Sequence, residues 1–321
     1  MSRRALLTGV PAAMIGSRGA FAQSWPARPI RIVVGLQAGG GTDVTMRAVA
    51  VALKDKLGQN IVVDNITGAG GSIASADVAR AAPDGYTFEA KTISAAVINA
   101  FVFQNLSYHP INDFKAVSLV GRAPLVAVIP SSVPAANLRE FLALLRANPG
   151  KYSYGSSGIG TIPHFAGEQF KQLADVDIVH VPYRGNGPAL VALLSGEIAM
   201  IFDTVGSTKQ YIEAGKIRGI GVTTPEPTEF MPDLPPLGSA IKGFALDTWF
   251  GLFAPAKTPD DIVARMSEAL RSALQETATA DQVRKYGYEP VGSSPADFDQ
   301  FWRKQLATFA PMIKTMGIKP N

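Results

Sequence analysis

Two short segments rich in glycine and hydroxyl groups have the residue types that small-molecule binding requires. The first, residues 38–43, reads AGGGTD and joins an expected strand to an expected helix. Three successive glycines leave backbone N–H groups uncovered, and a helix N-terminus carries about half a positive charge. Together these groups suit a carboxylate or a phosphate. The alternative is a tight strand–helix turn in which Thr42 caps the helix.

The second segment, residues 155–164, reads GSSGIGTIPH and occupies the same place in a second strand–helix unit. One such loop is weak evidence for a binding site, but two loops at matching places in two units are stronger evidence. Two lobes whose helix N-termini face one cleft would hold a small anion from both sides. Neither loop has the Gly-Lys-Ser/Thr ending of a nucleotide-binding P-loop or the Gly-x-Gly-x-x-Gly of a dinucleotide site, so NAD or ATP binding is poorly supported.

A serine hydrolase is the rival interpretation, with Ser156 as nucleophile and His164 as base. The Gly-x-Ser-x-Gly elbow is absent from this loop, because Ile159 stands at the place of the last glycine. The three histidines, His109, His164 and His180, show no metal-ligand spacing. We therefore expect no metal, no organic cofactor and no catalytic residue.

Two further polar residues follow apolar strands. Asp203 comes directly after the run AMIF, and a carboxylate at the C-terminal end of a strand lies where α/β proteins bind ligands. It could equally cap the next helix. Lys91 ends another strand and would either add a cation near the cleft or point into solvent.

These residues must be positioned by alternating strands and helices. The first unit is expected to have strands at 29–36, 61–64 and 86–91 and helices at 42–57, where Gly58 provides the C-cap, and 72–81. The second is expected to have strands at 125–129, 152–155, 178–182, 199–202 and 217–222 and helices at 137–147, 161–173 and 188–194. A further strand at 248–255 precedes helices at 258–276 and 295–316, which should pack back on one of the units. This alternation predicts two α/β units with mostly parallel sheets.

Composition agrees with a folded protein of this kind. Of the 321 residues, 47% are hydrophobic and 17% charged, which excludes intrinsic disorder, and the absence of cysteine excludes disulfides and thiolate chemistry. Three of the 30 basic residues and none of the 26 acidic ones lie in the first 22 positions, so the rest of the chain carries a net charge of +1. No basic run interleaved with aromatic residues is present, and we expect no nucleic-acid partner.

The first 22 residues are typical of a signal peptide. Arg3 and Arg4 precede an apolar stretch of about 12 residues, too short for the roughly 20 that span a membrane, and Ala20-Phe21-Ala22 forms a cleavage site. The adjacent arginines fit either twin-arginine or general secretory export. We expect a periplasmic protein without stable membrane insertion.

Several stretches, taken together and in order, resemble one family. They are RPIRIVVGLQAGGGTD, GAGGSIASADVARAAPDGYTF, YGSSGIGTIPHFAGEQF, VHVPYRGNGPAL, MIFDTVGS and WFGLFAPAKTP. From about Trp25 to the C-terminus the chain resembles the Bug-type extracytoplasmic receptors of tripartite tricarboxylate transporters. Gln37 departs from the family pattern, which commonly has an apolar residue or proline there.

The resemblance implies a two-lobed, type II-like periplasmic binding protein that closes on a small organic anion and passes it to membrane subunits. It implies lobe 1 at 27–122 plus 248–321, lobe 2 at 123–247, hinges near 121–125 and 247–251, and a monomer. The ligand-binding residues that it implies come from the two loops, the third strand and the end of a later strand: Gly39, Gly40, Gly41, Thr42, Asp43, Thr92, Ser156, Ser157, Gly158, Thr161, His164 and Asp203. Gln37, although it departs from the family pattern, is expected to bind the ligand with them. A secreted hydrolase on this architecture, or a ligand sensor without a transport role, are the alternatives.

Overall fold

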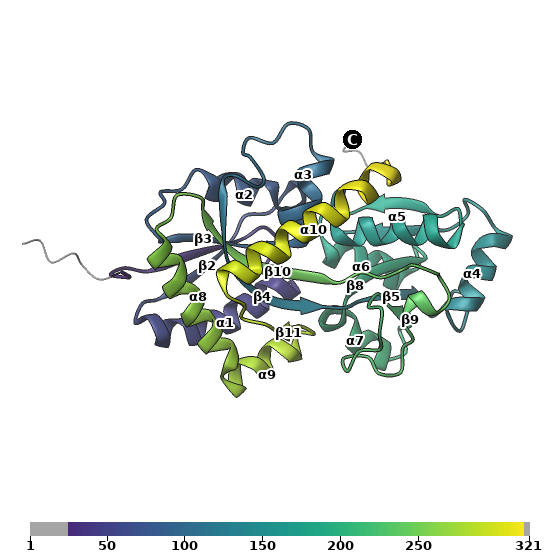
Figure 1. Ribbon diagram of the computed structural model, residues 1–321. Helices are drawn as coiled ribbons and strands as arrows, with labels where there is room; N and C mark the ends of the chain where they lie inside the picture. The colour runs from purple at the N-terminus through teal and green to yellow at the C-terminus, as the bar shows by residue number, and fades with distance from the viewer. Residues whose placement is uncertain (1–24, 318–321) are drawn as a thin grey trace, which may run out of the picture.

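The computed structural model describes residues 25–317, which form two α/β lobes side by side (Figure 1). Lobe 1 contains a six-stranded sheet in the order β11-β4-β10-β3-β1-β2. Lobe 2 contains a five-stranded sheet in the order β7-β6-β8-β5-β9. The strands of lobe 1 are β1 (Ile30–Val34), β2 (Ile61–Asn65), β3 (Thr87–Thr92), β4 (Phe114–Ala123), β10 (Thr248–Pro255) and β11 (Glu289–Pro290). Those of lobe 2 are β5 (Leu125–Pro130), β6 (Ser153–Ser156), β7 (Val179–Pro182), β8 (Met200–Thr204) and β9 (Ile217–Val222).

Both sheets are mixed rather than mostly parallel. Strand β1 pairs in parallel with β2 and β3, and β6 pairs in parallel with β7 and β8. Strand β10 runs antiparallel to β3 and β4, and β5 runs antiparallel to β8 and β9. These antiparallel strands enter or leave a lobe directly from the other lobe, without the crossover helix that a parallel neighbour requires. The two-lobed α/β prediction is confirmed with this correction.

Helices cover the faces of both sheets. Lobe 1 has α1 (Gly41–Leu57), α2 (Ser72–Ala79), α3 (Asn99–Val102), α8 (Asp260–Gln275), α9 (Thr277–Lys285) and α10 (Pro295–Met316). Lobe 2 has α4 (Leu138–Ala147), α5 (Ile162–Ala174), α6 (Asn186–Ser195) and α7 (Val205–Glu213). In α1 the buried residues Met46, Val49 and Leu53 recur at helical spacing, and Gly58 ends the helix in the left-handed conformation, with φ of 68°.

Helix α10 runs from lobe 1 to the edge of lobe 2, next to α5 (Figure 1). The indole N–H of Trp302 donates to the carbonyl oxygen of Ala96 over 2.8 Å, which fixes the middle of the helix to lobe 1. Further along, the ring of Phe309 lies 4.8 Å from that of Phe165 in α5. The last helix therefore packs back on lobe 1 as expected, and it also joins the two lobes.

Lys91 lies neither near the cleft nor in solvent. It is fully buried in lobe 1, with its ammonium 3.8 Å from the carboxylate of Glu89 and 3.2 Å from the centre of the Phe114 ring. Burial lowers the pKa of Lys91 to about 8 and raises that of Glu89 to about 7. This pair belongs to the core and leaves the ligand chemistry to other residues.

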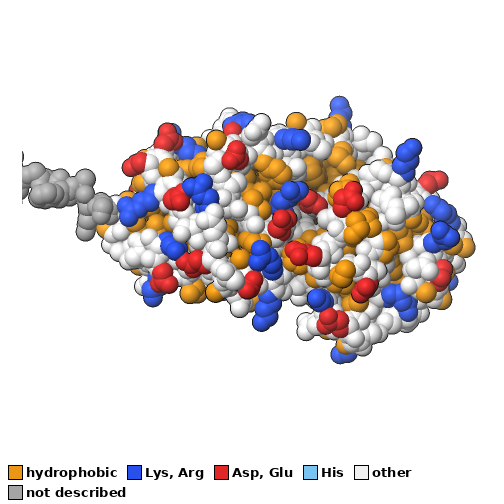
Figure 2. Space-filling view, turned by 60° about the horizontal axis from the view of Figure 1, so that its bottom comes forward, with side chains coloured by type: hydrophobic (Ala, Val, Ile, Leu, Met, Phe, Trp, Pro, Cys, Tyr) orange, Lys and Arg blue, Asp and Glu red, His pale blue; other side chains and the backbone are white. Residues whose placement is uncertain are grey.

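The surface carries both signs of charge. On the face shown in Figure 2, basic and acidic side chains are interspersed among apolar ones, as expected for a chain with nearly balanced charge. No helix within residues 25–317 combines the length and apolar character that crossing a membrane requires. The predicted signal peptide, residues 1–22, lies outside the described residues.

Candidate functional site

A cavity of about 440 Å³ lies between the lobes and is lined by both glycine-rich segments. Lobe 1 contributes the loop between β1 and α1, and lobe 2 contributes the loop between β6 and α5. The predicted site residues that line this cavity are Gln37, Gly39, Gly40, Gly41, Thr42, Thr92, Ser157, Thr161 and Asp203. Gly158 lines an adjoining cavity of about 540 Å³, which shares Gln37 and Ser157 with the first.

Four helices begin at this cavity. Helix α1 comes from lobe 1, and α5, α6 and α7 come from lobe 2; each has residues of its first turn in the cavity wall. The residues that precede them, Gly40, Thr161, Gly185 and Thr204, make no side-chain capping hydrogen bond. Partial positive charge and backbone N–H groups thus converge from both lobes, which is the electrostatic environment that a small anion prefers.

Direct hydrogen bonds join the lobes at the rim of the cavity. The backbone N–H of Ile162, in the first turn of α5, donates to Ser94 Oγ over 2.9 Å. The side-chain amide of Gln37 donates to the carbonyl oxygen of Arg184 over 2.9 Å. Both bonds connect lobe 1 to lobe 2, so the structure shows the lobes closed against each other.

Asp203 is the next-to-last residue of β8 and lines the cavity wall, with only 1% of its surface exposed. Its Oδ1 accepts hydrogen bonds from the backbone N–H of Thr204, over 2.7 Å, and from the side chain of Asn186. Its Oδ2 is buried and has no hydrogen-bond partner. Burial raises the pKa of Asp203 to about 6, against the opposing effect of these hydrogen bonds. A buried carboxylate oxygen without a partner is costly.

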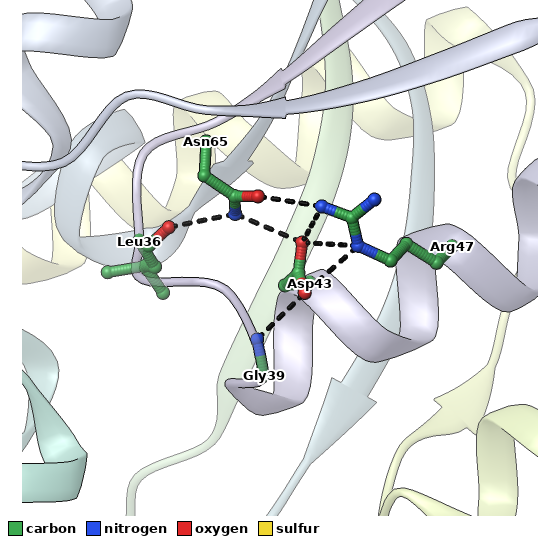
Figure 3. Close-up of polar contacts among 5 residues, drawn as sticks. All are labelled: Leu36, Gly39, Asp43, Arg47 and Asn65. Carbon is green, nitrogen blue, oxygen red and sulfur yellow. Dashed lines mark hydrogen bonds and ion pairs between the residues drawn. The ribbon is translucent and has the colours of Figure 1, made fainter.

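Asp43 follows the glycines but does not line the cavity. Figure 3 shows its carboxylate turned back into lobe 1, where it accepts hydrogen bonds from the backbone N–H of Gly39 and from the side chains of Arg47 and Asn65. Asn65 also donates to the carbonyl oxygen of Leu36, so this network fixes the glycine loop at both ends. Burial alone would raise the pKa of Asp43, but these hydrogen bonds outweigh it and lower the pKa below its usual value. Its oxygens are therefore occupied by the protein itself.

Ser156 and His164 also lie behind the cavity wall. Ser156 Oγ shares a hydrogen bond of 2.7 Å with Nε2 of His180, which stacks on His164 at a ring distance of 3.9 Å. His164 Nδ1 accepts from the backbone N–H of Gly160. Burial lowers the pKa of His164 and His180 to about 4, so both rings are neutral near pH 7. These three residues support the shape of the second loop.

Several lining residues were missed by the sequence analysis: Ser94, Asn186, Thr204, Ser207, Thr248, Tyr286 and Tyr288. Asn186 at the start of α6 had a detectable signal, because it follows a strand and Gly185 within a stretch that resembles the family. The tyrosines had none, since they reach the cavity from a segment close to the C-terminus.

Within residues 25–317 no group of three or more histidine, aspartate or glutamate side chains is arranged to hold a metal ion. The chemistry of the cavity is therefore that of helix N-termini, hydroxyl groups, amides and one buried acid.

Comparisons with known proteins agree with this geometry. A family model described as the tripartite tricarboxylate transporter family receptor matches residues 45–318. The protein BugT of Bordetella pertussis is 30% identical over 300 residues, which cover 93% of this chain and 92% of that protein.

Solved structures show the same fold. A Rhodopseudomonas palustris protein with adipate is 32% identical with a TM-score of 0.88, covering 92% of this chain and 100% of that one. MatC from the same organism, with bound malate, is 28% identical with a TM-score of 0.84, covering 90% of this chain and 100% of that one.

Proposed function

Because the chain belongs to the tripartite tricarboxylate transporter receptor family, we propose that it captures a small organic carboxylate in the cavity between its lobes. The observation that carries this proposal is the convergence of four uncapped helix N-termini, one from lobe 1 and three from lobe 2, on one cavity. The N–H groups of these helix ends, other than that of Ile162, which is bonded to Ser94, replace the water shell of a carboxylate together with the hydroxyl of Thr42. The hydroxyl of Thr161 instead donates to the carbonyl oxygen of Gly158 and shapes the second loop. The relatives with adipate and malate support this ligand class.

A thermal-melt screen of the protein, stripped of carried-over ligand by partial unfolding and dialysis, tests the proposal. A ligand at 100 times its dissociation constant stabilises the folded state by about 2.7 kcal/mol, which raises the melting temperature by several degrees. The panel contains mono-, di- and tricarboxylates, acidic amino acids and neutral controls such as nicotinamide. A shift with carboxylates but not with neutral compounds is expected, and a flat response to every carboxylate would refute the proposal.

A matched pair of variants in α1 locates the site. Thr42→Val removes a hydroxyl that lines the cavity, and a hydrogen bond to a charged group is worth enough that affinity should fall about tenfold. Thr45→Val removes a fully buried hydroxyl one turn along, which has no partner and lies outside the cavity wall. Affinity that falls equally in both variants, or in neither, would place the anion elsewhere.

The lobes are proposed to move as units about hinges near 121–125 and 247–251. The chain passes from β4 to β5 through Pro124, and it re-enters lobe 1 at the start of β10. Opening must break the bond from Ile162 to Ser94 and separate Phe309 from Phe165. Distances between fluorophores placed on the two lobes should shorten on ligand binding, and distances that do not change would contradict the hinge.

We also infer that the ligand is released unchanged. Ser156 is 1% exposed, lies outside the cavity wall, and is already bonded to His180. The protein should show no ester or amide hydrolysis that is lost in Ser156→Ala; such an activity would instead support the secreted hydrolase.

Membrane subunits of a transporter are the proposed partners of a monomeric receptor, and residues 1–22 are proposed to direct its export to the periplasm. Cell fractionation with and without these residues tests the export. Ligand uptake that requires both the receptor and membrane subunits separates transport from a role in sensing alone.

A further inference from the structure

Tyr288 lines the cavity, and no sequence motif predicts a role for its hydroxyl. Tyr288 lies between α9 and β11, 3% exposed, and its ring packs edge-on against Phe250 with the ring centres 5.1 Å apart. The ring also fits against Gly41, where a Cβ would lie 3.2 Å from Tyr288 Cε2. Gly41 thus makes room for the tyrosine at the N-terminus of α1, and the hydroxyl is held at the cavity wall.

The O–H of Tyr288 is only weakly hydrogen-bonded within the protein. Its one hydrogen bond to the described residues is a contact of 3.4 Å with Thr42 Oγ1, well beyond the usual 2.7–2.8 Å for paired hydroxyls. Burial and the negative charge of Asp203 both raise the pKa of Tyr288, to about 12, despite the contact with Thr42. The phenol therefore remains a neutral donor at physiological pH.

Asp203, at the same end of the cavity, has an acceptor oxygen that lacks a hydrogen-bond donor. The position where Gly41 would carry a Cβ is 3.4 Å from Tyr288 Oη and 3.6 Å from Thr204 Oγ1, next to Asp203 in the chain. Asp203 Oδ2 is buried without a donor. Both residues line the cavity, so a ligand group placed between them would accept from Tyr288 and donate to Asp203.

Few ligand groups do both. An ionised carboxylate only accepts, and an ammonium only donates, whereas an alcohol hydroxyl has one donor and two acceptor lone pairs. We propose that Tyr288 binds the ligand directly and, together with Asp203, selects a hydroxycarboxylic acid, whose carboxylate is held at the helix N-termini and whose hydroxyl lies between these two side chains. This inference rests on the proposed function and names the class of carboxylate.

Isothermal titration with pairs of acids that differ only by the hydroxyl tests this selection. Suitable pairs are lactate and propionate, malate and succinate, and citrate and tricarballylate. In each pair that binds, the hydroxylated acid should bind about tenfold more tightly, because it satisfies two otherwise unpaired groups. Tyr288→Phe should remove most of that preference by weakening the hydroxylated acid about tenfold, and it should leave its partner within twofold.

Tyr108→Phe is the matched control, because it also removes the unpaired hydroxyl of a buried tyrosine of lobe 1 but lies outside this cavity. It should change neither affinity. If Tyr288→Phe fails to fold, as judged by its melting curve, the preference of the wild-type protein within the pairs and its loss in Asp203→Asn become the readout.

The outcomes separate the two proposals. Equal affinity within every pair, equal weakening of both members by Tyr288→Phe, or a preference for aspartate over both malate and succinate would overturn the selection by hydroxyl while leaving carboxylate capture intact. Binding of no carboxylate at all would overturn both.

Discussion

Asp203 should lower the stability of the ligand-free protein above pH 6, and Asp203→Asn should recover it. In the folded state its pKa is about 6, above the usual value of 3.8, because burial disfavours the charged form. The folded protein therefore binds a proton more readily than the unfolded chain between about pH 4 and pH 6. Stability contributed through this residue falls as the pH rises through that window and stays low above it.

The size of the effect follows from the difference in pKa. About two pKa units at 1.36 kcal/mol per unit give about 3 kcal/mol at pH 8. Asparagine keeps an oxygen to accept from Thr204 and Asn186, and it replaces the unpaired Oδ2 by an amide that carries no charge. In a protein of this size, about 3 kcal/mol raises the melting temperature by about 5 °C.

Melting curves and urea titrations of stripped wild-type protein and Asp203→Asn, at pH 4.5 and pH 8, test this. The variant should be more stable at pH 8, and the difference should shrink at pH 4.5, where the wild-type carboxyl is protonated. The buried Glu89–Lys91 pair also titrates in this range, but it is present in both proteins and cancels in the comparison. A variant that is less stable at pH 8, or that differs by the same amount at both pH values, would refute the reasoning.

Three further outcomes follow from the contacts around the cavity. Ser94→Ala removes the acceptor of the Ile162 N–H and should weaken ligand binding about fivefold, because it disfavours the closed form. Ser118→Ala is the control: it removes a hydrogen bond to Ser293 within lobe 1 and should leave affinity unchanged in the same titration. Gly167→Ala places a Cβ 2.0 Å from the buried ring of Tyr154 and should lower the free energy of unfolding in urea by about 3 kcal/mol. Gly187→Ala in α6 meets no atom within 4 Å and should raise it by up to about 1 kcal/mol; similar losses in both variants would contradict the packing. Burial holds the pKa of His164 and His180 at about 4, below the usual 6.5, so the stability that these two rings contribute should fall as the pH drops from 6.5 to 4. Relative to the wild type, which has the same buried carboxyls, His164→Phe should therefore gain stability between pH 6.5 and pH 4; a difference in urea titrations that does not change with pH would count against neutral buried rings.

The elements that build the cavity could be predicted from local patterns. Periodic apolar residues and a C-terminal glycine predict α1, and a short apolar run predicts β1. Strand β6, SYGS, has no apolar run, but the strand predicted at 152–155 overlaps it, so both glycine-rich loops are found at strand–helix junctions. Strand β4, FKAVSLVGRA, was missed because lysine, serine, glycine and arginine interrupt its apolar run. It becomes a strand because β10 and β11 pair with it from distant parts of the chain.

Residues that reach the cavity through long-range contacts could not be predicted. Tyr288 lies 246 residues from its contact Thr42, and nothing in its immediate sequence marks a ligand-facing side chain. Ser94 lies on the single π-helical turn (Ser94–Ile98) after β3, and its bond to Ile162 exists only when the lobes meet. These positions depend on how the two lobes pack, which local propensity does not describe.

Two aspartates show what distinguishes a supporting residue from a ligand-facing one. Asp43 lies in the first turn of α1 and Asp203 lies near the end of β8, and they are 2% and 1% exposed, so residue type and burial do not separate them. The hydrogen bonds made by their carboxylate oxygens do separate them. The carboxylate of Asp43 accepts hydrogen bonds from Gly39, Arg47 and Asn65, and its pKa is lowered. Asp203 has one carboxylate oxygen without a hydrogen-bond donor, and its pKa is raised. An unmet hydrogen bond in a closed cavity destabilises the empty protein and is relieved by the right ligand, so the cost at Asp203 is the physical origin of the selectivity expected there.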